Sequence, residues 1–169
     1  MISAGYTDDL VPVNEETRFY TRTRAEYPNL PSSPSFGSLA HPRGQAQPEV
    51  TSALRTLEDE WIDHYLADVG TAPPSEVVSY TQTCPNGTDA GGPYTAADWA
   101  HISAGEVRVE DSTDQTIDPD GGSLAVGAGW NSISALQNPC GIQPGAAETG
   151  SANYLTEPAP AGGYTMQGA

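Results

Sequence analysis

Lysine is absent from this sequence, and basic residues are few. Six arginines stand against 22 acidic residues in a chain of 169, which gives a formal net charge of −16. A surface this acidic repels phosphate backbones, so we expect no nucleic-acid partner. Anionic membrane surfaces are disfavoured for the same reason. We interpret the acidity as a source of solubility through self-repulsion and infer no partner from it.

Cysteine is scarce, and long apolar runs are missing. The two cysteines, Cys84 and Cys140, do not form a CxxC pair, so a metal-binding cysteine motif is not expected. The three histidines lie too far apart in the sequence to suggest a metal cluster. No apolar run approaches the roughly 20 residues of a membrane-spanning helix. The residues from Met1 to Gly5 also lack the pattern of a signal peptide. We therefore expect no metal, no cofactor and no membrane partner.

Glycine and proline are abundant, with 18 and 15 residues, while hydrophobic residues make up only 37% of the chain. So many turn-forming residues favour short strands and loops over a helix bundle. Three tryptophans and eight tyrosines can still build a core. The length suits one domain, or a small layer with a second compact unit.

Residues 1–72 have the pattern of an α/β region. The expected elements are a strand end at Met1–Ala4, a loop at Gly5–Asp9, a helix at Val13–Tyr27 and a short strand at Ser35–Ala40. Asn14 is a candidate N-cap for this helix. The residues that share one helical face are Phe19, Tyr20, Thr23 and Tyr27.

The clearest helix covers residues 48–67. Pro48 suits its first turn. Its apolar stripe, at spacings of three and four, consists of Val50, Leu54, Leu57, Trp61 and Tyr65. Acidic residues fill much of the opposite face, and Gly70 with the prolines at 73 and 74 ends the helix.

Residues 73–169 have a different pattern, that of a β-rich region. Glu76–Thr83 and Glu106–Glu110 alternate between apolar and polar residues, which predicts strands. Weaker strand candidates lie near 123–128 and 151–156. Turn residues such as those of Gly91–Pro93 separate these segments. The region therefore resembles the opening of a β-sandwich or jelly roll.

The loop Gly5-Tyr6-Thr7-Asp8-Asp9-Leu10-Val11-Pro12 places carboxylates after the first strand. A carboxylate held at the carboxyl edge of a strand can orient an imidazole, as the acid turn of α/β-hydrolases does. Asp8 fits this register better than Asp9 because it stands four positions before Pro12, although Asp9 remains an alternative. Two aspartates before a helix are also ordinary capping residues.

A histidine follows the second expected strand. In Leu39-Ala40-His41-Pro42 the proline favours extended geometry at His41. His41 comes 33 residues after Asp8, with a helix and a strand between them. The order acid then histidine agrees with the Ser…Asp…His order of α/β-hydrolases. A single loop histidine is usually only solvated, but this pair at this spacing indicates half of a catalytic triad.

No nucleophile accompanies the pair. The sequence contains no G-x-S-x-G motif, and Gly122-Ser123 and Gly150-Ser151 lack the second glycine. Without a nucleophile elbow, Asp8 and His41 cannot perform acyl transfer unaided. We expect either that the serine belongs to sequence upstream of Met1 or that the chain is not a hydrolase.

Four stretches carry a family resemblance. They are Gly5–Pro12, His41–Gln45, Leu57–Tyr65 and Tyr80–Pro85, in that order. Together they resemble secreted actinobacterial α/β-hydrolases of the X-prolyl dipeptidyl-peptidase and cocaine-esterase type. Cys140 and Gly162–Thr165 also look like the β-rich region of that family. The resemblance covers nearly the whole chain.

The resemblance implies a secreted serine hydrolase that acts on a peptide or ester substrate without a cofactor. Residues 1–72 would be the C-terminal remnant of the α/β-hydrolase sheet, and residues 73–169 a jelly-roll-like region. Asp8 would be the triad acid and His41 the base. Two departures stand out: the nucleophile is missing, and the strand before His41 is broken by prolines.

In an exported protein Cys84 and Cys140 would pair. They lie 56 residues apart, and closing a loop of that length would stabilise the fold by about 4 kcal/mol in the chain-entropy model. Two buried free thiols are the alternative.

The rival hypothesis is a non-catalytic β-rich binding or structural module. Exposed aromatic residues such as Trp99 and Trp130 would then form a stacking platform. The geometry of Asp8 and His41 discriminates between the two hypotheses, because a triad needs them within hydrogen-bond reach. If the chain is the remnant of a larger sheet, an unpaired strand edge would favour self-association.

Overall fold

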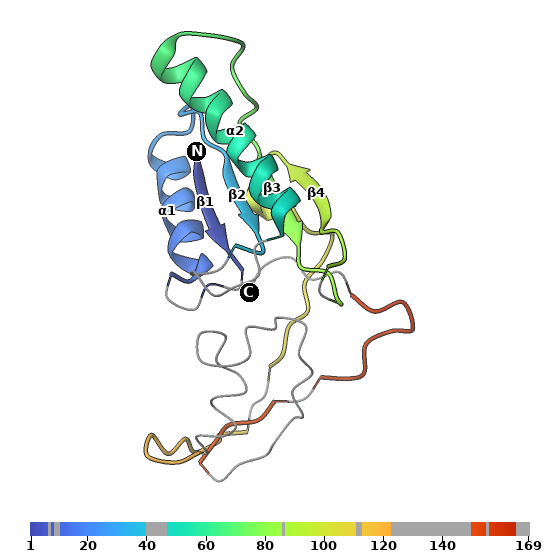
Figure 1. Cartoon of the computed structure of the whole chain (residues 1–169). Coiled ribbons are helices and arrows are strands. Elements are labelled where there is room, and N and C mark those ends of the chain that lie inside the picture. The colour runs from blue at the N-terminus through green and yellow to red at the C-terminus, as the bar shows by residue number, and fades with distance from the viewer. Residues whose placement is uncertain are drawn as a thin grey trace.

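The computed structural model describes residues 1–6, 8, 11–39, 47–85, 87–110, 113–122, 150–154 and 156–164. Its elements, in order, are β1 (Ile2–Gly5), α1 (Val13–Glu26), β2 (Pro34–Gly37), α2 (Pro48–Ala67), β3 (Val77–Thr81), β4 (Gly91–Ala96) and the short 3-10 helix η1 (Trp99–His101) (Figure 1). In the part of the chain described here, no helix is long and apolar enough to cross a membrane.

The four strands form one mixed sheet with the order β1-β2-β3-β4. β1 pairs with β2 in parallel, and so does β2 with β3, whereas β4 pairs with β3 in the antiparallel direction. A parallel sheet with helical crossovers is the arrangement that the alternating pattern of the first 72 residues predicts. The α/β character of this region is therefore confirmed.

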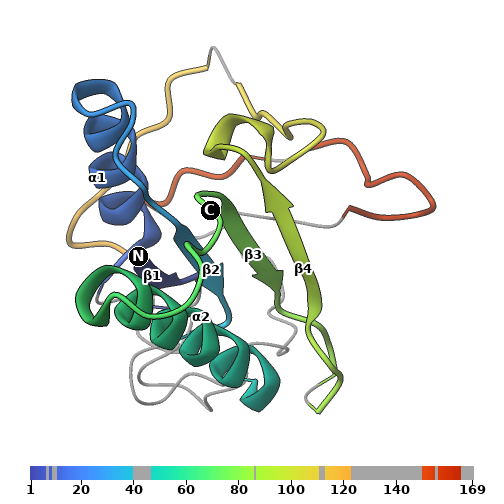
Figure 2. The same cartoon turned by 90° about the horizontal axis from the view of Figure 1, so that it is seen from above.

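The two helices cover opposite faces of the sheet (Figure 2). Neighbouring residues of a strand point to opposite faces, and β2 shows this directly. Phe36 packs in the core cluster with Val13 and Tyr20 of α1. At the next position, a Cβ on Gly37 would lie 2.8 Å from Val50 Cγ1 of α2. Since β1, β2 and β3 follow one another across the sheet, the two crossover connections have opposite hands, although right-handed crossovers are the rule.

α2 has the bounds that the sequence predicts, Pro48–Ala67. Its buried residues belong to the expected stripe and are Val50, Leu54 and Trp61. The helix ends where Asp68 adopts a left-handed conformation with φ 58°. Tyr65, at the end of the stripe, is 43% exposed. A stripe of this length specifies a helix strongly because every turn contributes an apolar contact.

α1 starts at the expected residue, but its buried face is not the face that carries Phe19 and Tyr27. Its buried residues are Val13, Glu16 and Tyr20, whereas Phe19 and Tyr27 of the expected face are 59% and 55% exposed. The spacing 13, 16, 20 is equally helical, but a carboxylate in the middle hides it from a search for apolar residues. Asn14 is not the N-cap either, because Pro12 occupies that position.

β4 lies where the sequence predicts a turn. Gly91, Gly92 and Pro93 belong to this strand, and their pairing with β3 contains a register shift between Ser79 and Thr81. Such a bulge accommodates glycine, and Gly92 has φ 116°. Proline is tolerated because β4 is an edge strand of the sheet. The turn prediction for Gly91–Pro93 is therefore wrong.

The expected strand at Glu106–Glu110 does not form. Arg108 instead makes ion pairs with Glu106 and Glu110, the residues two positions away on either side. The charged residues of this alternating segment thus form local ion pairs, and the segment does not pair with a strand in the described residues. The described residues of 151–156 also contain no strand, and the candidate near 123–128 lies outside the described residues.

β3 and β4 follow the change of region that the sequence predicts near residue 72, yet they belong to the same sheet as β1 and β2. The sheet therefore continues into the segment expected to be β-rich. β1 pairs with β2 alone among the described strands, so its other edge carries no neighbour there.

Candidate functional site

The carboxyl ends of β1 and β2 meet at one edge of the sheet, as the ends of parallel strands must. The Tyr6 backbone N–H, just after β1, donates to the Gly37 carbonyl at the end of β2 over 2.9 Å. A Cβ built on Gly5 would lie only 1.2 Å from the Leu39 carbonyl oxygen. The loop after β1 and the loop after β2 are therefore in direct backbone contact.

Asp8 is held in a tight turn at this edge. Its backbone N–H donates to the Gly5 carbonyl over 3.2 Å, and its Oδ1 accepts the Val11 N–H over 3.0 Å. The side chain is half-buried. A carboxylate has two oxygens and about four acceptor positions, so the bond to Val11 uses only part of the acceptor capacity of Asp8. Asp8 thus follows the first strand outside any helix or strand, as expected, and its role as a triad acid stays a prediction.

Four residues of the sequence predictions lie outside the described residues: Asp9, His41, Trp130 and Cys140. Leu39, two positions before His41, is the last described residue of its loop. Cys84 lies exposed in the segment after β3, and its pairing with Cys140 stays a prediction. The approach of Asp8 to His41 stays a prediction as well.

An aromatic stack packs next to the loop after β1. The Tyr6 ring lies 5.7 Å from Phe36, nearly parallel to it, and Phe36 lies 4.8 Å from Trp99. The Tyr6 hydroxyl and Ser79 Oγ of β3 are 2.9 Å apart and hydrogen-bonded. Trp99 thus packs against the core and is only partly exposed, whereas the rival hypothesis expects an exposed stacking surface.

Glu16 is a buried acid that sequence reasoning missed. It faces the sheet from the first turn of α1 and is only 7% exposed. Burial raises the pKa of Glu16 to about 7, and the Ser35 backbone amide offsets part of this rise without the geometry of a full hydrogen bond. Burial raises the pKa of the Tyr6 phenol, the hydrogen bond with Ser79 offsets part of this rise, and the Glu16 carboxylate adds a smaller increase. The helical spacing of Val13, Glu16 and Tyr20 is the signal that reveals it.

The two described histidines have structural surroundings. His101 Nδ1 lies 2.6 Å from Asp98 Oδ1 on the exposed η1 turn, and this hydrogen bond lowers the pKa of Asp98. His64 lies edge-on to Tyr65 with ring centroids 4.6 Å apart. Within the described ranges, no three metal-ligating side chains come together.

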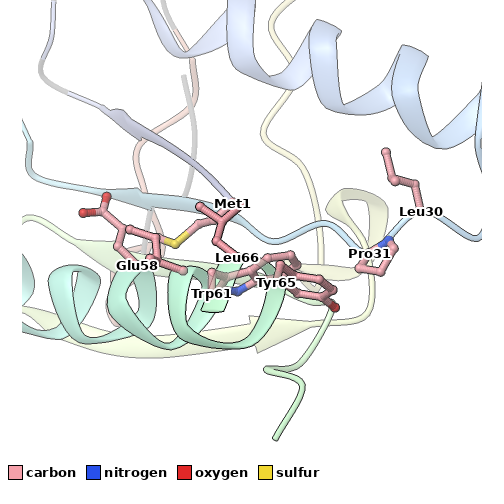
Figure 3. Close-up of a pocket in the computed structure, with 8 residues that line it drawn as sticks. Met1, Leu30, Pro31, Glu58, Trp61, Tyr65 and Leu66 are labelled. Carbon is pink, nitrogen blue, oxygen red and sulfur yellow. The ribbon is translucent and has the colours of Figure 1, made fainter. Parts of the chain in front are cut away.

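A pocket of about 520 Å³ lies at the other end of the sheet. Its lining residues come from the start of β1, the turn before β2 and the C-terminal half of α2, and are Met1, Leu30, Pro31, Glu58, Trp61, Ile62, Tyr65 and Leu66 (Figure 3). β1 has four residues, so roughly 13 Å of strand separates this pocket from the Asp8 edge. The pocket is therefore distinct from the candidate catalytic edge.

No protein-family model, curated protein or solved structure matches this chain. At the carboxyl edge, the described part offers an oriented carboxylate next to the loop that leads to a histidine. A carboxylate paired with a histidine could hold and move a proton, but it would supply no nucleophile.

Proposed function

We propose that this chain carries the acid and the base of a serine hydrolase, with Asp8 as the acid and His41 as the histidine. The enzyme would be a secreted α/β-hydrolase of the X-prolyl dipeptidyl-peptidase and cocaine-esterase type, and its substrate a peptide or an ester. The nucleophilic serine would come from sequence that this chain does not contain.

The contact between Gly5 and Leu39 supports the proposal most strongly. Asp8 follows Gly5 by three residues, and His41 follows Leu39 by two. Covalent geometry keeps the Cα atoms of Leu39 and His41 within about 7 Å. The acid and the histidine thus start from two backbone segments that touch, at the sheet edge where open α/β folds bind ligands.

The roles follow from the chemistry of the two groups. The Asp8 carboxylate would accept a hydrogen bond from one ring N–H of His41, fix its tautomer and stabilise the imidazolium. The other ring nitrogen would take the serine proton and pass it to the leaving group. Neither step requires a metal or an organic cofactor.

The remaining parts of the proposal concern the C-terminal region and the compartment. Residues 73–169 would continue from the sheet into a jelly-roll-like region. Export would permit a disulfide between Cys84 and Cys140. The resemblance of the flanking motifs supports both of these proposals.

Histidine titration by NMR tests the pair without the missing serine. A neighbouring carboxylate stabilises imidazolium, so Asp8→Asn should lower the pKa of His41 by about one unit or more. His64 and His101 serve as internal references in the same spectra. Asp9→Asn is the matched control, because it removes the same charge one residue away.

The outcomes are distinct. A lowered His41 pKa in Asp8→Asn alone supports the assignment, and an effect of Asp9→Asn alone transfers the role to Asp9. If neither variant moves the His41 pKa, the triad proposal fails. A second test uses the unaltered chain, which should neither hydrolyse activated esters above background nor react with a fluorophosphonate probe. Serine-dependent turnover would contradict the absence of a nucleophile.

A further inference from the structure

The connection between β3 and β4 contains an asparagine followed by a glycine. Asn86-Gly87 is the single Asn-Gly pair of the sequence. Asn86 itself lies outside the described residues, but its neighbours on both sides are described. The Thr88 backbone N–H donates to the Pro85 carbonyl over 3.1 Å, so the residues that flank the pair are joined to each other. Figure 2 shows this connection projecting beyond the ends of both strands.

Gly87 presents an accessible backbone nitrogen. The residue is exposed, and nothing lies within 4 Å of a Cβ built on it. Among the described residues, no hydrogen bond engages the Gly87 N–H. Its φ of 87° lies in the left-handed region, which glycine adopts without steric cost. The nitrogen that follows Asn86 in the chain is therefore neither crowded by a side chain nor held by a described hydrogen bond.

An asparagine side chain can react with the backbone nitrogen of the next residue. That nitrogen loses its proton to water or hydroxide and attacks the side-chain carbon Cγ. The N–Cγ bond forms, the Cγ–Nδ2 bond breaks, and ammonia leaves. Water then opens the cyclic succinimide at either of its carbonyls and yields aspartate or isoaspartate. Water is the only co-reactant, and no oxidation or reduction occurs.

We propose that Asn86 is a site of spontaneous deamidation in the folded chain, with the Gly87 nitrogen as the nucleophile. Glycine favours the ring closure because no Cβ crowds the attacking nitrogen. The product adds one negative charge to a chain whose net charge is already −16. In the isoaspartate form the main chain is also longer by one carbon. The reaction is independent of the proposed triad, since it uses none of its residues.

A second asparagine in an exposed turn shows what the structure adds to the sequence pair. Asn29 lies between α1 and β2 and is followed by Leu30. The Leu30 backbone N–H donates to the Tyr27 carbonyl over 3.0 Å. The nitrogen that would attack Asn29 is therefore held in a hydrogen bond and lies next to a branched side chain. We expect Asn29 to persist while Asn86 reacts.

The connection that would be modified is attached to the first turn of α2. Gln47 Nε2 donates to the Thr88 carbonyl over 2.8 Å, and the Ala90 backbone N–H donates to Glu49 Oε1 over 2.9 Å. A main chain lengthened at position 86 changes the path that leads to Thr88. The modification therefore acts on the contact between this connection and α2.

The reaction can be followed by mass spectrometry on the folded chain, incubated at neutral and at mildly alkaline pH. After reduction, trypsin releases the peptides 25–43 and 56–108, which contain Asn29 and Asn86 respectively as their single asparagine. The peptide 56–108 should gain about 1 Da with time, because an amide becomes an acid. It should give products of equal mass, one of which co-elutes with the peptide of Asn86→Asp. The peptide 25–43 should keep its mass.

Matched variants assign the roles of the two residues. Asn86→Gln lengthens the side chain by one carbon, disfavours the ring closure and should abolish the gain of mass. Gly87→Ala places a Cβ next to the attacking nitrogen and should slow the reaction about tenfold or more. Asn29→Gln is the control and should leave the rate at Asn86 unchanged. Far-UV circular dichroism checks that each variant is folded.

The chain unfolded in guanidinium chloride supplies the reference rate. Because Gly87 is exposed in the folded chain, the folded and unfolded rates should agree within about threefold. The proposal fails if the peptide 56–108 of the folded chain keeps its mass, or reacts more than about tenfold more slowly than in the unfolded chain. It also fails if Asn29 reacts as fast as Asn86, or if Gly87→Ala reacts at the unaltered rate.

Discussion

Replacing the buried carboxylate at position 16 should make the chain more stable at neutral pH. The pKa of Glu16 rises from 4.5 to about 7 on folding because the side chain is buried between α1 and the sheet. Below pH 4.5 the carboxyl is protonated in both the folded and the unfolded chain. Between pH 4.5 and 7 the unfolded chain ionises first, so the stability contributed by the neutral form is progressively lost.

The size of the effect follows from that interval. Each pH unit of difference corresponds to about 1.4 kcal/mol, so the whole interval amounts to about 3 kcal/mol. About 2.5 kcal/mol of this is lost between pH 5 and pH 8. Glu16 is 7% exposed, so solvent screening reduces the effect only slightly. Glu16→Gln keeps the shape of the side chain and removes the ionisation.

The assay is urea unfolding followed by circular dichroism at several pH values from 5 to 8. The free energy of unfolding of Glu16→Gln minus that of the unaltered chain should rise by about 2.5 kcal/mol across this range. Glu15→Gln is the control in the same helical turn, because Glu15 is exposed and pairs with Arg18. Its effect should stay below about 1 kcal/mol at every pH. If the difference for Glu16→Gln is flat with pH, Glu16 is not a buried neutral acid and the reasoning is refuted.

Two further predictions concern the site edge and the cysteines. Gly5→Ala should destabilise the chain by about 3 kcal/mol, because its Cβ would overlap the Leu39 carbonyl. The control Gly105→Ala should be close to neutral, because nothing lies within 4 Å of the added atom. Equal melting temperatures for the two variants would contradict the close contact. If Cys84 and Cys140 pair, the intact mass under oxidising conditions should be about 2 Da lower than after reduction, and identical masses would exclude the disulfide. Reduction of the disulfide should also lower the free energy of unfolding by about 4 kcal/mol.

The sequence predicts the helices better than the strands because helices contribute longer patterns. The stripe from Val50 to Tyr65 spans most of α2 and admits one interpretation. β1 and β2 have only four residues each, so neighbouring glycines and prolines dominate their signal. β4 escapes sequence reasoning because its bulge and its edge position permit the residues that normally mark a turn.

The candidate site also has parts that the sequence could predict and parts that it could not. That an acid loop follows the first strand could be predicted, since strand, loop and helix alternate clearly there. The contact of Gly5 with Leu39 could not, because it joins residues 34 positions apart in the sequence. The buried position of Glu16 was also hidden, because a search for apolar residues passes over a carboxylate that is neutral in its surroundings.

The backbone contact at Gly5 also bears on how this sequence can diverge. Leu39 leaves no space for any side chain at position 5, so the glycine is required by the packing of two loops whatever the chain does. If Asp8 and His41 serve the proposed hydrolysis, descendants that lose this activity should drift at positions 8 and 41 while position 5 stays glycine. Descendants that keep all three residues would be the ones still under selection for the chemistry.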